Sequence, residues 1–308
     1  MTQTQFGATL VSDQPSQKRN ARRDTNSPNN EPSSTRFAVT TVPVPTPGSD
    51  EVFLKVHSAS LNPVDVSIQK TGGLVDHYPA IIGGDIADEA VAKLGLASRT
   101  TTPGFNSTLL GDIPKNRSYG QAAMMPLVRT TAYLAMYYET PHGLGLQNPL
   151  GSLGAYTGTP SLVVGSSSTV SQYAIQFAKA SGFNPIIATA STKHTEHLQV
   201  YPWTPSAILS SPAQSLTYVV NAISDGFNGE SISRVVASKN LPQNKQFLRD
   251  QWANMGKLLS DGIVRPLSTL EVKPGGLAGI PVGLQRLEEG KVSGTKLMGH
   301  PQETGPGY

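Results

Sequence analysis

The stretch at residues 160–184, PSLVVGSSSTVSQYAIQFAKASGFN, decides the fold. Residues 161–164 predict a buried strand and 165–168 a tight turn. Residues 170–180 predict a helix, because their apolar side chains recur at helical spacing. A second apolar strand is expected at 186–190, and it completes a βαβ unit.

The turn of this unit stands where dinucleotide-binding proteins hold a diphosphate. In that position, backbone N–H groups and the positive end of the helix dipole face the ligand. The usual fingerprint has three spaced glycines, but here Gly165 is followed by Ser and Thr residues. Serine hydroxyls are able to bond a phosphate instead. Taken alone, the turn is equally compatible with a core unit that binds nothing and with a diphosphate site.

Composition narrows the class of protein. The chain of 308 residues is long enough for two domains, and its 30 Gly and 24 Pro favour an α/β protein. A net charge of +3 is too small to indicate a nucleic-acid partner. The absence of cysteine excludes disulfides and cysteine-ligated zinc. No apolar run suggests a membrane helix or a signal region, so we predict a cytoplasmic protein that does not associate with membranes.

The N-terminal residues 1–36 are polar and are predicted to be disordered, with a short strand conceivable at 9–11. Their basic cluster suits a solvated tail better than an import signal. It consists of Lys18, Arg19, Arg22 and Arg23.

The pattern changes at residue 37. Residues 37–44 and 51–59 alternate apolar and polar side chains, which predicts half-buried antiparallel strands separated by a turn at 45–50. A short helix is expected to end near Lys70, and a strand at 86–93 follows the Gly-Gly-Asp turn.

These segments resemble a known family. PTPGSDEVFLKVHSASLNPVD at 45–65 and YPAIIGGDIADEAV at 78–91 are similar to the N-terminal catalytic lobe of the medium-chain dehydrogenase/reductase superfamily. The similarity is greatest to the zinc-free quinone and enoyl reductases, especially the fungal enoyl reductases that act in trans on polyketide synthases. The absence of cysteine agrees with this branch.

The resemblance implies an α/β fold in which a Rossmann-type parallel sheet domain is inserted in a GroES-like, mostly antiparallel β domain. The expected bounds are 150–265 for the dinucleotide-binding domain and 37–149 plus 266–308 for the GroES-like domain.

Two later blocks extend the resemblance. IPKNRSYGQAAMMPLVRTTAYLAMYY at 113–138 is similar to the segment that links the two lobes and flanks nicotinamide and substrate. It also predicts an amphipathic helix that buries Leu134, Tyr137 and Tyr138, and both interpretations can hold together. GGLAGIPVGLQRLEEGKVSGTK at 275–296 is similar to the family's closing helix, which Gly290 ends, and to a following strand at 291–298.

The resemblance also implies a site. The implied cofactor-binding residues are Asn62, Pro63, Val64, Asp65, Ser167, Ser168, Thr169, Val170, Ser191, Thr192, Lys193, His194, Val292 and Ser293. The implied substrate-binding residues are Pro126, Leu127, Thr130, Thr131 and Tyr133. NADPH is favoured over NADH, because no acidic residue follows the second strand and Lys193 supplies positive charge.

No metal site is predicted. His194 and His197 are three residues apart, but no third ligand is evident, so surface histidines are the favoured interpretation.

The chain departs from the family in four places, the first being that the polar tail replaces the family's N-terminal strands. The barrel strand after the Gly-Gly-Asp turn has no counterpart in the polar residues 96–106. The strand expected between 197 and 218 is hard to recognise, and 225–246 is too short and polar for the usual helix and glycine-rich strand. Missing strands would leave unpaired sheet edges, so the dinucleotide-binding domain is expected to be incomplete.

Two functions remain. The first is an NADPH-dependent reductase that adds hydride to an enoyl thioester or a conjugated carbonyl and stabilises the enolate with hydrogen-bond donors. Its substrate would be an enoyl compound, either a free small molecule or bound to a carrier. A polyketide synthase is the partner considered, and the protein would be a monomer or a homodimer. The proton donor stays open among Tyr133, Tyr137 and solvent. The second function is a catalytically impaired binding or accessory subunit. A hydrolase is disfavoured, because no Ser/His/Asp arrangement is recognisable.

Overall fold

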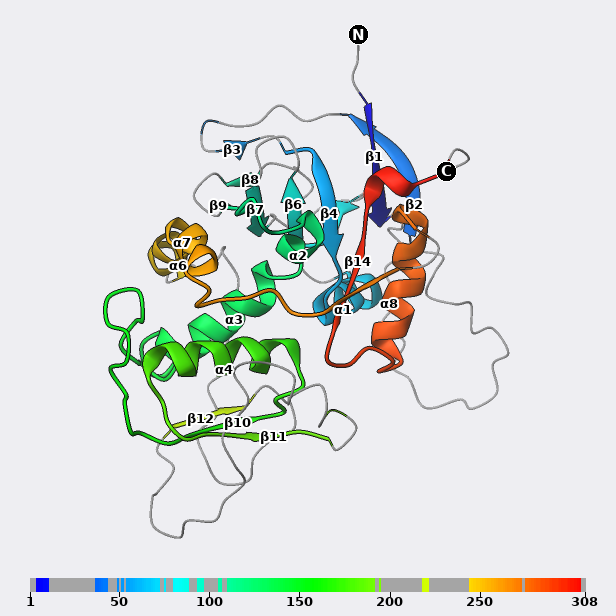
Figure 1. Ribbon diagram of the computed structural model, residues 1–308. Helices are drawn as coiled ribbons and strands as arrows, with labels where there is room; N and C mark the ends of the chain where they lie inside the picture. Colours follow the sequence, from blue (N-terminus) through cyan, green and yellow to red (C-terminus); the bar gives the residue numbers. More distant parts are fainter. Residues whose placement is uncertain are drawn as a thin grey trace.

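The computed structural model describes residues 4–10, 37–43, 49, 51–52, 54–72, 75, 80–88, 93–96, 105–106, 110–191, 194, 218–221, 244–272 and 275–305. Within these ranges the chain forms four sheets surrounded by helices (Figure 1). No helix in the described ranges is long and apolar enough to cross a membrane.

The largest sheet has six strands in the order β13-β14-β4-β6-β7-β9. Its members are β4 (Val56–Ser60), β6 (Asp85–Asp88), β7 (Lys93–Leu96), β9 (Leu110–Asp112), β13 (Thr269–Glu271) and β14 (Lys296–Gly299). All neighbours are antiparallel except β13 and β14. The sheet therefore joins strands from the first third of the chain to strands from its end, and Figure 1 shows β14 in red beside β4 in blue.

A second sheet corrects the disorder predicted for the N-terminal tail. β1 (Thr4–Leu10) pairs antiparallel with β2 (Phe37–Pro43) along its whole length, and also with β5 (Ala80–Ile81). The prediction was wrong here because the alternating TQFGATL finds a strand partner 27 or more positions away, which composition cannot reveal. Residues 11–36, including the basic cluster, lie outside the described residues.

The strands predicted at 37–44 and 51–59 form, but they do not pair with each other. The second is split into β3 (Glu51–Val52), which pairs with β8 (Phe105–Asn106), and β4, which pairs with β6 and β14. The expected turn between them thus connects two different sheets rather than closing a hairpin.

β9 lies just beyond the polar residues 96–106 and pairs with β7. Of residues 96–106 themselves, only 96 and 105–106 are among the described residues. Two helices, α6 (Asn244–Ala253) and α7 (Met255–Ser260), cover this edge so closely that a Cβ on Gly111 would lie 2.8 Å from Met255 Cβ. Covering the edge protects the unpaired strand from foreign pairing.

Helices α1 (Pro63–Thr71) and α8 (Ile280–Glu288) lie side by side beneath the large sheet (Figure 1) and share a small apolar core. α8 follows the short 3-10 turn η4 (Leu277–Gly279), and a second one, η5 (Pro301–Glu303), follows β14. The predicted stop is confirmed: Gly290 has φ 66° and Lys291 N–H donates to Arg286 O at 2.9 Å.

The predicted βαβ unit is also confirmed. β10 (Ser161–Val164), α4 (Thr169–Ser181) and β11 (Ile186–Thr189) follow each other, and β12 (Tyr218–Asn221) adds a third strand in the order β11-β10-β12. All pairings are parallel. The expected departures at 197–217 and 225–243 lie outside the described residues.

Two helices lead from the large sheet to this unit, α2 (Tyr119–Ala123) and α3 (Pro126–Tyr137). α3 packs along α4, where the rings of Tyr137 and Phe177 meet edge to face at 5.8 Å. The amphipathic helix predicted here is confirmed: Leu134 and Tyr137 are buried, and Tyr138 is half-buried against the same core.

Candidate cofactor and active site

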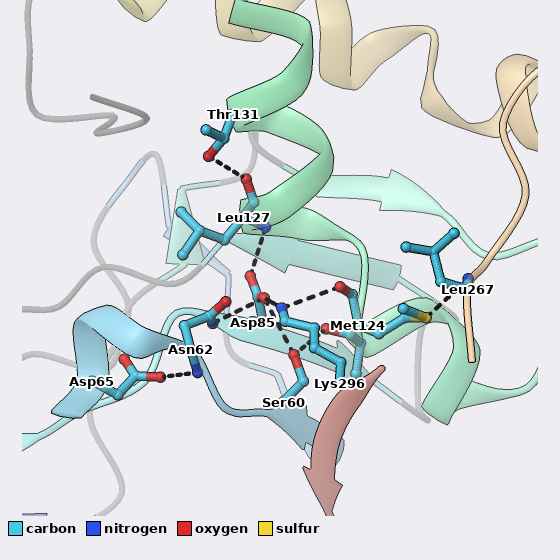
Figure 2. Close-up of polar contacts among 10 residues, drawn as sticks. Ser60, Asn62, Asp65, Asp85, Met124, Leu127, Thr131, Leu267 and Lys296 are labelled. Atoms are coloured by element: carbon cyan, nitrogen blue, oxygen red, sulfur yellow. Dashed lines mark hydrogen bonds and ion pairs between the residues drawn. The ribbon is translucent and has the colours of Figure 1, made fainter. Parts of the chain in front are cut away.

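A buried carboxylate, Asp85 at the start of β6, is the centre of a polar cluster (Figure 2). Its Oδ1 accepts the backbone N–H of Leu127 at 2.7 Å, and its Oδ2 accepts from Asn62 Nδ2 at 3.1 Å and Ser60 Oγ at 3.2 Å. Leu127 is in the first turn of α3, so the carboxylate satisfies an N–H that has no partner within the helix. Asp85 therefore holds the start of α3 against β4 and β6.

Lys296, the first residue of β14, completes the cluster. Its Nζ forms an ion pair with Asp85 Oδ2 and donates to Met124 O at 3.1 Å. The lysine side chain is 4% exposed and the aspartate side chain 0%. A buried charge is tolerated when it is paired and hydrogen-bonded, as both charges are here.

Two of the implied cofactor-binding residues reach this cluster. The Asp65 carboxylate accepts the N–H of Asn62 at 2.8 Å, which fixes the entry into α1, and the Asn62 amide continues to Asp85. Pro63 is exposed and Val64 half-buried in the first turn of α1. Asn62 and Asp65 are thus joined to Leu127, an implied substrate residue, through an aspartate that sequence reasoning had not singled out.

The serine turn after β10 uses its hydroxyls for two purposes. Ser166 Oγ donates to Val163 O at 2.7 Å and Ser171 Oγ donates to Val164 O at 3.1 Å, so these two side chains tie the turn to its own strand. Ser168 caps α4, its Oγ accepting the N–H of Ser171 at 3.1 Å. Gly165 has φ 70°, which favours glycine at this position.

The implied diphosphate residues are arranged to meet an anion. Ser167, Ser168, Thr169 and Val170 are half-buried at the start of α4. The first N–H groups of a helix have no intrahelical partners, and the helix dipole is positive there. The residues present therefore fit a bound diphosphate.

The segment before β14 contacts this turn. Gln172 Nε2 donates to Ser167 O at 2.9 Å and to Gly294 O at 3.3 Å. His194 Nε2 and Ser293 Oγ, two implied cofactor residues from distant parts of the chain, lie 2.8 Å apart. Sequence reasoning missed Gln172, although its position on the first turn of α4 was a usable signal.

The other implied cofactor residues are less informative. Ser191 is exposed, and its carbonyl accepts the N–H of His194 at 2.9 Å. Val292 packs against the apolar core shared by α1 and α8. Thr192 and Lys193 lie outside the described residues, as does His197.

The implied substrate residues divide into two groups. Leu127 and Thr131 lie at the Asp85 end of α3, where Thr131 Oγ1 donates to Leu127 O at 2.8 Å. Pro126 is buried and is the first residue of the helix. Thr130 is buried and accepts a hydrogen bond from Arg129 Nη2 at 3.3 Å. Tyr133 lies further along the helix, and its hydroxyl bonds Asn148 rather than the cluster.

Neither tyrosine is placed to give a proton at the cluster. Tyr137 Oη donates to Phe177 O at 3.1 Å and lies 2.8 Å from Ser181 Oγ. Burial raises the pKa of both Tyr133 and Tyr137, so each phenol is a weaker acid than usual. The Tyr133 hydroxyl accepts from Asn148 Nδ2, and the choice among the three proton donors stays a prediction.

Asp85 and Lys296 were both within the segments that carry the family resemblance, but they are 211 positions apart and no spacing rule links them. In the described part of the chain, no group of three His, Asp or Glu side chains is arranged to hold a metal ion.

Comparisons with known proteins give relatives at low identity. No protein-family profile matches the chain. The trans-enoyl reductase tndF of Aspergillus flavipes is 25% identical over 333 residues, covering 83% of this chain and 93% of that protein. The dehydrogenase pigH of Monascus ruber is 29% identical over 188 residues, covering 52% of this chain. The match spans about half of pigH, 50% of its length.

Solved structures share the fold. A protein from Rhizobium etli described as a zinc-dependent alcohol dehydrogenase aligns with a TM-score of 0.66 at 16% identity, covering 97% of this chain and 99% of that one. The CurK enoyl reductase aligns with a TM-score of 0.61 at 15% identity, covering 96% and 99%. The comparisons thus confirm the resemblance to fungal trans-enoyl reductases and to quinone and enoyl reductases of the medium-chain dehydrogenase/reductase type.

Proposed function

We propose that this chain is an NADPH-dependent, zinc-free reductase that transfers hydride to the activated double bond of an enoyl thioester or a conjugated carbonyl. One observation carries the proposal. Residues 293–296 reach the serine turn through Gly294, whose carbonyl accepts from the Gln172 side chain that also bonds Ser167 O. They contact His194 through Ser293 and the Asp85 cluster through Lys296. In a dinucleotide the nicotinamide and the adenosine lie on either side of the diphosphate, so the nicotinamide site must adjoin the diphosphate site, and this segment runs from one candidate to the other.

The arrangement we propose places the cofactor between two lobes. A GroES-like lobe would comprise 37–149 and 266–308, and the inserted dinucleotide-binding lobe 150–265. The six-stranded sheet, which draws on both ends of the chain around the parallel sheet, supports this division. Ligands of open α/β sheets bind at the carboxyl ends of the strands, which is where the serine turn lies.

Different residues would bind the cofactor and position the reacting groups. The N-terminus of α4 and the hydroxyls of Ser167 and Thr169 would hold the diphosphate. Asp85 would keep Asn62 and the start of α3 in position, so that Leu127 and Thr131 border the reacting groups.

When bound, NADPH supplies the hydride that adds to the β-carbon of the substrate. The electron pair of the double bond then moves toward the carbonyl, and hydrogen-bond donors of the protein stabilise the enolate oxygen. Solvent would deliver the proton to the α-carbon. The relatives named trans-enoyl reductases support an enoyl substrate. A carrier-bound substrate with a polyketide synthase as its source is our proposal from the sequence resemblance alone.

Two measurements test the proposal. Fluorescence titration should show NADPH binding, and addition of a crotonyl or longer enoyl thioester should then decrease the absorbance of the reduced nicotinamide. No binding at near-millimolar NADPH would refute the reductase. Binding without turnover of any enoyl thioester or quinone would favour the accessory subunit.

The preference for NADPH has its own test. Lys193→Ala should weaken the binding of NADPH by at least about tenfold, the size of a lost charge-assisted contact. It should leave the binding of NADH almost unchanged. Lys115→Ala, at an exposed position on a different loop, is the control and should change neither affinity. Equal losses for both cofactors would show that Lys193 does not meet the 2′-phosphate.

A further inference from the structure

A second buried cation lies on α3, away from the ion pair. Arg129 is fully buried, and its Nη2 donates to Thr130 Oγ1 at 3.3 Å. Its Nε and Nη1 have no hydrogen-bond partner in the structure. Burial lowers the pKa of Arg129 to about 9, so the guanidinium keeps its charge at neutral pH. Buried guanidinium groups are normally satisfied by several acceptors, and here most of the donors are not.

The guanidinium faces an aromatic ring from α6. Arg129 Cζ lies 4.7 Å from the ring centroid of Trp252, a cation–π contact. Trp252 is itself buried, and its Nε1, which is only a donor, has no hydrogen-bond partner. The amide of the preceding residue, Gln251, is buried and unpaired as well, at both its Nε2 donor and its Oε1 acceptor. The place where α3 meets α6 therefore carries several unused N–H donors.

The carboxylate that acts on Arg129 is already paired. Asp85 forms an ion pair with Lys296. Tyr133 and Tyr173 also act on Arg129 electrostatically, but neutral phenols add no negative charge.

We propose that Arg129 and Trp252 bind a small monovalent anion of halide size in the protein interior between α3 and α6. The anion accepts from the free edge of the guanidinium and from the indole N–H, and its charge pairs with that of Arg129. A nucleotide or an acyl thioester is excluded as occupant, because all the donors are buried. The site is distinct from the serine turn and does not depend on the reductase proposal.

The test uses the full chain, purified with gluconate in place of chloride, since gluconate is too large for the site. Bromide is added at constant ionic strength, and the fluorescence of Trp252 is followed in a Trp203→Phe background, these being the 2 tryptophans of the chain. We expect saturable quenching and a rise in melting temperature with bromide. Crystals grown in bromide should show an anomalous peak beside the guanidinium of Arg129.

Two variants identify the ligands. Arg129→Met should weaken bromide binding by at least about tenfold, the effect expected for a charge-assisted donor. Arg249→Met, on the exposed face of α6, is the matched control and should bind bromide as the parent does. If Arg129→Met fails to fold, Trp252→Phe keeps the ring, removes the N–H and should still weaken the bromide-dependent rise in melting temperature.

Two results would overturn the proposal. One is a bromide response of the same size and affinity in Arg129→Met and the parent protein. The other is an ordered water, with no anomalous peak, beside Arg129 in bromide-grown crystals. NADPH binding need not change in either case, so failure of this proposal and failure of the reductase proposal are distinguishable.

Discussion

The serine turn and the Asp85 cluster are both polar, but they are built differently. In the turn, two hydroxyls bond backbone three residues away: Ser168 bonds the N–H of Ser171, and Ser166 bonds Val163 O. The partners of Asp85 are 25, 42 and 211 positions away, at Ser60, Leu127 and Lys296. A local turn can therefore lose a hydroxyl and still form, whereas the cluster exists only when distant segments have assembled.

The two regions also differ in whether water can replace a side-chain group that a substitution removes. At the half-exposed turn, water can replace a missing hydroxyl. At the cluster, water has no access to the ion pair, so removing one charge leaves the other unpaired and buried. The predictions below use this difference.

The largest effect is expected at Lys296. Lys296→Met should lower the free energy of unfolding by about 3–5 kcal/mol, because it leaves the Asp85 carboxylate buried without its cation. Lys291→Met, which removes an exposed lysine paired with Glu289 just before the same strand, should cost at most about 0.5 kcal/mol. Urea denaturation measures both.

A companion variant isolates the charge. Adding Asp85→Asn to Lys296→Met removes the orphaned carboxylate and should recover part of the loss. A loss below about 1 kcal/mol for Lys296→Met would contradict the importance of the pair, because it would lie within the range of ordinary surface substitutions.

The next effect is expected at the end of α4. Gly182 has φ 91°, and a Cβ there would lie 2.7 Å from Gly154 Cα. Gly182→Ala should therefore cost about 2–4 kcal/mol, from the left-handed conformation and the clash together. Gly290→Ala is the matched control with φ 66° and open space, and its cost should be about 1–2 kcal/mol from conformation alone. Equal costs in thermal unfolding would show that the approach to Gly154 is not tight.

The smallest effects are expected within the serine turn. Ser168→Ala removes the cap of α4 and should cost about 1 kcal/mol of stability. Ser167→Ala should change stability by at most about 0.5 kcal/mol, yet weaken NADPH several-fold if the proposed diphosphate site is correct. Urea denaturation and NADPH titration of the same two variants separate folding from binding. The reverse ranking in stability would show that the cap has been assigned to the wrong serine.

Much of the local structure was predictable. The βαβ unit, the amphipathic helix that became α3, and the stop of α8 at Gly290 all follow from residue spacing within about 25 positions. The strand at residues 4–10 was not, because its composition is polar and its partner is distant. The expected strand at 291–298 proved shorter, since β14 begins only at Lys296.

The candidate site, like the fold, was predictable from the sequence only in part. Sequence resemblance placed Asn62, Asp65 and Leu127 at the site, and the structure brings these three together. The resemblance had also offered Tyr133 and Tyr137 as proton donors. In the structure, the Tyr133 hydroxyl bonds Asn148 and the Tyr137 hydroxyl bonds Phe177 O.

The sequence alone determined the elements whose signals are short: a glycine at a helix end, an apolar period, a serine turn between strand and helix. Only the tertiary structure decided which charges are neutralised. Asp85 is paired with Lys296, whereas Arg129 keeps unused donors beside Trp252. The physical reason is that burial sets the energy of a charge, and burial is a property of the assembled fold rather than of neighbouring residues in the chain.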